Sequence, residues 1–217
     1  MKTPTAAYPV TLKIDLPDRA LNRLTTAFRP ILIVPIAIVL GLLSGGGGGP
    51  AWEWGRPAMH GAWQTGATAM GVLVLPVLLM ILFRRKYPRW WFDWNVQLVR
   101  FSLRVGVYAT LLSDVYPSTD EEQAVHLKMP YPDAAKDLSP WLPLVKWFLA
   151  IPHLVVLAFL GVAAWVCVVI VWFAILFTGR YPKDLAEFVV GVMRWGVRVA
   201  AYAFLLVTDV YPPFTLD

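Results

Sequence analysis

Long apolar runs alternate with short polar stretches along this chain. The runs cover roughly residues 28–43, 66–84, 142–160 and 162–178. They carry too few polar positions for half-buried helices of a soluble protein, and they are typical of helices in contact with lipid. One continuous helix from Trp141 to Phe177 would be about 55 Å long, well beyond a hydrocarbon core of about 30 Å. We therefore expect two helical hairpins, the second of which turns at Gly161.

Two short segments alternate apolar and polar residues, the period of a half-buried strand. In the first segment Val10, Leu12 and Ile14 alternate with polar residues, and in the second Val125 and Leu127 do the same. We predict one strand in each half of the chain, and we expect the two strands to pair in a small cytoplasmic sheet.

A polar stripe follows each hairpin, on helices predicted near 90–113 and 184–207. Its members recur at steps of three or four residues, so they share one helical face. The first stripe is Asp93, Gln97, Arg100, Arg104 and Tyr108, and the second is Glu187, Gly191, Arg194, Arg198 and Tyr202. Each helix is predicted to end before an Asp-Val-Tyr-Pro segment, which begins at Asp114 or Asp209.

These elements recur in the same order, which indicates a tandem duplication. The strand pattern at Val10 returns 115 residues later at Val125, and the Tyr-Pro at Tyr87 returns 94 residues later at Tyr181. The second shift is smaller because the first copy contains a glycine-rich loop, residues 44–64, that has almost no counterpart in the second copy. We predict a mainly α-helical integral membrane protein with repeats at 1–118 and 119–217, each a strand, a transmembrane hairpin and an amphipathic interfacial helix.

Composition and charge agree with a membrane protein. Of the 217 residues 58% are hydrophobic and 15% are charged, well below the roughly 25% typical of soluble domains. The net charge of +5 comes from cations that flank the apolar runs, so we expect membrane lipid and no nucleic acid as partner. The positive-inside rule places both hairpin entrances and both chain termini on the cytoplasmic side of the membrane. An alternative topology has three crossings per copy, with the copies inverted as in many transporters.

No combination of residues predicts catalysis. The three histidines are not spaced as metal ligands, and nucleophile, phosphate-loop and zinc-protease motifs are absent from the sequence. We expect no cofactor, no metal and no enzyme activity. For His153, within an apolar run, we expect a neighbour that satisfies its hydrogen bonds, and haem ligation is the less favoured alternative.

The arginine pairs allow two interpretations. The guanidinium groups of Arg100, Arg104, Arg194 and Arg198 match the phosphate oxygens of lipid headgroups. Alternatively they form internal ion pairs, with Asp93, Asp114, Glu187 and Asp209 as the candidate acids. The sequence leaves both readings open.

The hairpin, the Arg-x-x-x-Arg-x-x-x-Tyr helix and the closing Asp-x-Tyr-Pro-Pro-Phe resemble a bacterial membrane-protein family of unknown function. The residues that carry the resemblance are Arg194, Arg198, Tyr202, Asp209, Tyr211, Pro212, Pro213 and Phe214. It implies a bacterial membrane location, which we expect to be the inner membrane, and it implies nothing about activity. We expect a non-catalytic scaffold or accessory subunit that binds other membrane subunits or a second copy of itself, with anionic lipid as a further ligand. A small transporter or channel is the alternative.

Overall fold

A computed structural model describes residues 8–16, 21–43, 74–121 and 123–217 of the chain. The fold is mainly helical. The elements in chain order are β1 (Thr11–Ile14), α1 (Arg23–Leu43), a short helix Val74–Arg84 that ends in a π-helical turn, α3 (Arg89–Ala109), β2 (Val125–Lys128), α4 (Leu142–Thr178) and α5 (Lys183–Ala203). The predicted glycine-rich loop at 44–64 lies outside the described residues, as does the start of the predicted helix 66–84.

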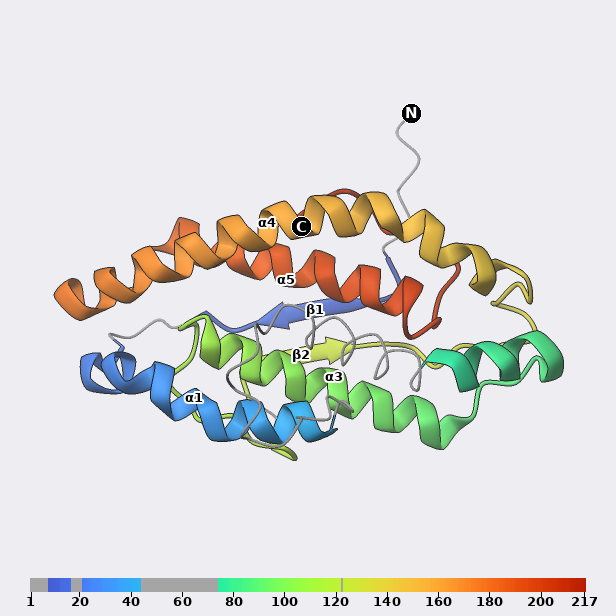
Figure 1. Cartoon of the computed structure of the whole chain (residues 1–217), viewed down its shortest axis with the longest axis horizontal. Helices are drawn as coiled ribbons and strands as arrows, with labels where there is room; N and C mark the ends of the chain where they lie inside the picture. Colours follow the sequence, from blue (N-terminus) through green and yellow to red (C-terminus); the bar gives the residue numbers. More distant parts are fainter. Residues whose placement is uncertain (1–7, 17–20, 44–73, 122) are drawn as a thin grey trace, which may run out of the picture.

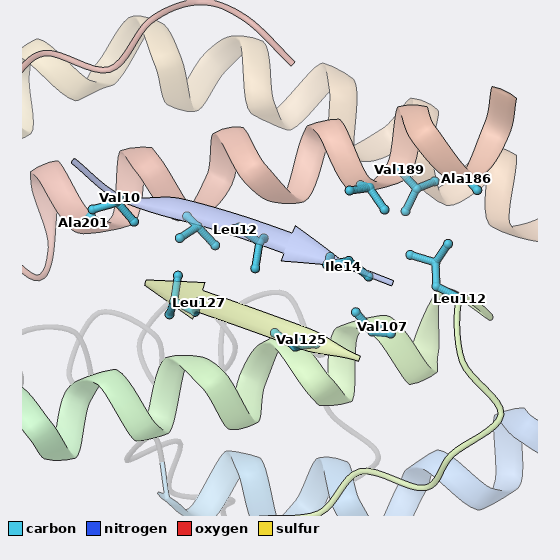
Figure 2. Close-up of a cluster of buried hydrophobic side chains, with 12 residues drawn as sticks. Val10, Leu12, Ile14, Val107, Leu112, Val125, Leu127, Ala186, Val189 and Ala201 are labelled. Atoms are coloured by element: carbon cyan, nitrogen blue, oxygen red, sulfur yellow. The ribbon is translucent and has the colours of Figure 1, made fainter. Parts of the chain in front are cut away.

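The two predicted strands are present and pair antiparallel, each supplied by a different half of the chain. Leu12 lies opposite Leu127, and Ile14 lies opposite Val125. These four side chains point inward, whereas Thr11, Lys13 and Lys128 on the other face are exposed. The strand pair, which we call the ribbon, therefore has one apolar face and one polar face (Figure 2).

Helices α3 and α5 lie under the apolar face of the ribbon and have buried surfaces on two sides. On α5, Val189 and Val197 contact the ribbon cluster, whereas Trp195 and Val199 on the opposite side pack against Ala150 of α4. On α3, Val107 faces the ribbon, and Phe101 and Val105 pack against Ile36 of α1. The layers are thus the ribbon, then α3 and α5, then α1 and α4.

The outer helices α1 and α4 leave most of their apolar side chains uncovered. In the most apolar 18-residue windows of these helices only 17% and 11% of the residues are buried. A core helix of a soluble protein is mostly buried, and these two helices differ from it in that respect. Both are long and apolar enough to cross a membrane. In the view of Figure 1 α4 runs along the upper edge and α1 along the lower edge, and the two helices contact each other through part of their length.

The predicted second hairpin is wrong. Residues 142–178 form one helix of 37 residues, and Gly161 lies within it without a turn. We expected a bend because a straight helix of this length exceeds the thickness of a hydrocarbon core, but a helix that does not cross the membrane has no such length limit. Gly161 has no adjacent proline or polar residue that would end a helix. Tertiary packing also supports both halves of α4, because Ala150 contacts α5 whereas Val171 and Ile175 pack near Leu21 and Leu111.

Candidate functional site

The arginines of the two stripes bind main-chain carbonyls within the fold. Arg100 Nη2 donates to the carbonyl of Leu127 at 3.1 Å, and Arg194 Nε donates to the carbonyl of Leu12 at 3.2 Å. Hydrogen-bonded and non-hydrogen-bonded residue pairs alternate along an antiparallel ribbon. Asp15 N bonds to Ala124 O, so the Leu12–Leu127 pair is a non-hydrogen-bonded pair, and its backbone N–H and C=O groups point to the outer edges of the ribbon. Each arginine thus satisfies an edge carbonyl that a two-stranded ribbon otherwise leaves unpaired.

The second arginine of each stripe holds the segment that follows its own helix. Arg104 Nη1 donates to the carbonyl of Ser118 at 2.8 Å. Arg198 Nη2 donates to the carbonyls of Thr215, at 3.1 Å, and Asp217. The guanidinium groups are therefore used for main-chain recognition inside the fold, which differs from both interpretations that the sequence allowed.

The candidate acids separate into two groups. Asp93 and Glu187 are exposed, and neither forms an ion pair with Arg100 or Arg194 in the described part of the chain. Asp114 and Asp209 do form ion pairs, but with cations on the outer helices. The expectation that these acids pair with the arginine stripes is corrected on this point.

The first of these ion pairs joins Asp114 to Arg29 of α1. The side chain of Arg29 is 3% exposed, and its Nη1 also donates to the carbonyls of Ser113, at 2.7 Å, and Tyr108, at 3.0 Å. The other carboxylate oxygen of Asp114 accepts from the backbone N–H of Asn22 at 2.9 Å. The guanidinium carbon lies 4.4 Å from the centre of the Tyr108 ring, within the range of a cation–π contact.

The second ion pair reproduces this arrangement in the other half of the chain. Lys146 Nζ lies 2.7 Å from Asp209 Oδ1 and donates to the carbonyl of Thr208 at 2.7 Å. Asp209 accepts from the backbone N–H of Ser139 at 2.6 Å, and the lysine nitrogen lies 5.1 Å from the centre of the Tyr202 ring. Burial raises the pKa of the Tyr108 and Tyr202 hydroxyls, so both rings are neutral beside their cations.

Sequence reasoning missed Arg29 and Lys146 as partners of these acids, although a signal was present. Lys146 is the only charged residue among the residues of α4. A lone cation in an apolar helix is stable only when an acceptor or a carboxylate reaches it from another element. The closing segments, with their single aspartates, were the matching candidates.

Two tyrosines, one after the short helix Val74–Arg84 and one after α4, reach from one half of the chain to the other. Tyr87 donates its hydroxyl to the carbonyl of Leu205 at 2.7 Å, and Tyr181 donates to the carbonyl of Thr110 at 3.2 Å. These carbonyls precede Leu206 and Leu111, which both adopt positive φ angles, 55° and 66°. Each tyrosine therefore binds the turn that follows α3 or α5 in the opposite half of the chain.

His153 is buried and accepts a hydrogen bond at Nδ1 from Trp195 Nε1 at 3.1 Å. The expectation of a neighbour that satisfies this histidine is therefore met for Nδ1 only, because the buried Nε2 has no hydrogen-bond partner among the described residues. Its ring also stacks on Phe214, with centroids 3.9 Å apart. In the described residues no group of three or more His, Cys, Asp and Glu side chains is arranged to hold a metal ion.

Because Arg100 and Arg194 bind ribbon carbonyls, we expect Arg194→Gln to lower the unfolding free energy by about 1.5–3 kcal/mol, the worth of a hydrogen bond to a charged group. Retention of anionic lipid should not change. Thermal unfolding and native mass spectrometry of the same preparation measure the two effects, and Arg84→Gln at an exposed position is the control. Loss of bound lipid at an unchanged melting temperature would instead support the headgroup interpretation.

A family model described as a domain of unknown function (DUF4389) matches residues 143–215. The match covers α4, α5 and the closing segment, and it includes Lys146, Arg194, Arg198 and Asp209. It is consistent with the family of unknown function that the sequence motifs resemble. No curated protein matches the chain, and no solved structure does.

Proposed function

We propose that this protein is a non-catalytic scaffold or accessory subunit embedded in a bacterial inner membrane. The observation that carries the proposal is the exposure of α4. Its outward side chains are apolar over the whole helix, among them Phe159 at 74% and Trp165 at 69% exposure, while its single charge, Lys146, is fully buried. Such a surface needs lipid or another apolar protein surface to cover it.

We further infer a tandem repeat whose two halves interlock. The Asp114–Arg29 and Asp209–Lys146 pairs use corresponding residues of the two halves, as do the Tyr87 and Tyr181 bonds. The ribbon takes one strand from each half. These reciprocal contacts support a duplicated unit with pseudo-twofold symmetry.

The layer order favours helices that lie along the membrane. The ribbon lies beside the middle of the long helices (Figure 1), with Lys13 and Lys128 exposed on its outer face. An upright α4 would place these charges near the bilayer centre, at about 2.5–3.5 kcal/mol each. With α1 and α4 embedded in the cytoplasmic leaflet, the ribbon faces the cytoplasm. Lys136 before α4 and Arg180 after it are then on the same side of the membrane, as the positive-inside rule requires.

The transporter alternative receives less support from this arrangement. Transporters line a path with polar groups from broken helices. In the described residues α4 is unbroken, and the arginines of α3 and α5 bind main-chain carbonyls. The polar groups inside the fold are thus used to hold the fold together.

We expect Phe159→Asp combined with Trp165→Asp to release the protein from membranes. Each aspartate costs up to about 3.5 kcal/mol within the apolar region. Extraction of membrane pellets with alkaline carbonate measures the released fraction. Thr11→Asp, on the exposed face of the ribbon, is the matched control and should remain in the pellet. Equal retention of both variants would contradict embedding through α4.

The subunit role itself is tested by mild solubilisation and identification of the proteins that co-purify in fixed stoichiometry. We expect a hetero-oligomer or a homo-oligomer. Recovery of a monomer that a small solute stabilises against heat would contradict the scaffold and favour transport.

A further inference from the structure

A groove lies between α1 and α4 where the two outer helices approach each other. Its volume is 410 Å³, at the lower end of the range for ligand pockets. Its walls are almost entirely apolar and include Ile33 from α1, Leu111, and Val168, Trp172 and Phe173 from α4. Because α1 and α4 are the lipid-exposed helices of the proposed arrangement, the groove opens to the acyl region of the membrane.

Local chemistry keeps this groove open. Pro30 on α1 has no N–H, so the carbonyl of Thr26 lacks its usual helical partner. Trp172 Nε1 donates to that carbonyl at 3.0 Å, which fixes the indole as one wall of the groove. Arg29 lines the groove as well, but Asp114 neutralises it. The interior is therefore suited to a hydrocarbon chain and not to a charge.

The corresponding position in the other half carries a large aromatic side chain in place of a proline. When Arg29 is aligned with Lys146, the next residue, Pro30, corresponds to Trp147. Trp147 Nε1 donates to the carbonyl of Ala203 at 2.9 Å, and Ala203 corresponds to Ala109, which lines the open groove. In one half an indole thus lies against the end of α5, whereas in the other half Pro30 leaves the groove beside Ala109 open.

Two exposed cations mark one end of the groove. Arg23 begins α1, and its Nε lies 3.4 Å from the point that a Cβ on Gly179 would occupy. Arg180 follows directly, and the N–H of Leu21 bonds to the carbonyl of Gly179 at 3.0 Å, which joins the two chain segments. Neither arginine forms an ion pair within the described ranges. By helical rise, both lie about 10 Å from the groove-lining Arg29 and Phe173.

We propose that this groove binds one anionic phospholipid, with an acyl chain between α1 and α4 and the phosphate between Arg23 and Arg180. The inference rests on the proposed membrane location and adds a defined ligand class and site to it. The site is distinct from the arginine stripes, because it uses the ends of the outer helices. Charge complementarity accounts for the headgroup, and the apolar walls account for the chain.

The first test fills the groove. Val169 lines the groove and is 38% exposed, whereas the neighbouring Ile170 is 53% exposed and is not among the lining residues, so Val169→Trp and Ile170→Trp add the same side chain at adjacent positions. Native mass spectrometry of purified protein with phosphatidylglycerol should show retained lipid falling about tenfold or more for Val169→Trp, since losing two buried methylenes already has that effect. Ile170→Trp should retain as much as the wild type. Equal retention by the two variants would overturn the proposal.

The second test addresses the headgroup. Arg23→Gln with Arg180→Gln should reduce the preference for phosphatidylglycerol over phosphatidylcholine with identical acyl chains by about 30-fold, from about 1 kcal/mol per arginine. Arg84→Gln with Arg85→Gln, which removes two exposed cations elsewhere, is the control and should keep the preference. An unchanged preference in the Arg23 and Arg180 variant would overturn the assignment of the phosphate.

Carbonate extraction of the same variants separates this inference from the proposed function. If Val169→Trp stays in the membrane and retains lipid like the wild type, the lipid site is wrong while the membrane location stands. If the wild-type protein itself is extracted, the proposed membrane location is wrong and the lipid site falls with it.

Discussion

Asp209→Asn is expected to lower the unfolding free energy by about 3–5 kcal/mol, because it leaves a buried cation without its counter-charge. Lys146 is fully buried, and its contacts are Asp209, the carbonyl of Thr208 and the ring of Tyr202. In a fold of ordinary stability this loss is a large fraction of the total. Thermal or denaturant unfolding in a fixed detergent measures the change.

Two further variants identify the cause of that loss. Asp133→Asn disrupts an exposed pair in which Lys136 Nζ lies 3.5 Å from the carboxylate, and we expect less than about 1 kcal/mol. Lys146→Met combined with Asp209→Asn removes both charges and should recover much of the stability, because no unpaired buried charge remains. A double variant as unstable as Asp209→Asn alone would show that the pair does not act through its charges.

Residues 1–118 and 119–217 are expected not to fold when they are produced separately. Each half contains only one strand of the ribbon, and a single strand has no partner. The apolar clusters are also shared, since Leu21 and Leu111 pack with Val171 and Ile175, whereas Leu138 and Leu206 pack with Val77 and Ile81. Separate halves should therefore aggregate or be degraded, and co-expressed halves should assemble.

Co-purification through a tag on one half measures this assembly. Leu12→Asp, on the apolar face of the ribbon, should abolish it, and Thr11→Asp on the exposed face should not. A half that is monomeric alone and unfolds in one cooperative transition would contradict the interlocked arrangement.

Local patterns predicted several elements well. Alternation at Val10, Leu12 and Ile14 identified a strand because one face of the ribbon is buried and the other is exposed. Helices α3 and α5 begin one residue before the predicted starts, after Pro88 and Pro182, where proline is compatible with a helix start and not with its interior. These features depend on neighbouring residues, which a sequence displays directly.

The partners of the charged residues were not predictable from the same patterns. Asp114 and Arg29 are far apart in sequence, as are Asp209 and Lys146, and helical spacing says nothing about contacts between distant elements. The seven-residue spacing from Asp93 to Arg100 suggested a local pair, but Arg100 reaches the ribbon carbonyl of Leu127 instead. A carbonyl becomes an edge carbonyl only when two strands from distant parts of the chain pair, so no local sequence pattern predicts that Arg100 will bind one.

The sequence by itself determined the apolar outer helices, the alternating strands and the polar stripes, because periodicity records which face of an element is buried. Only the tertiary structure decided that α4 is one helix of 37 residues, and that the stripes hold the main chain. The physical reason is that a long apolar run satisfies its own backbone hydrogen bonds in either a straight or a bent form. The choice between them depends on what packs along the helix. The N-terminal part of α4 packs against α5 of the same half, whereas its C-terminal part packs near Leu21 and Leu111 of the other half.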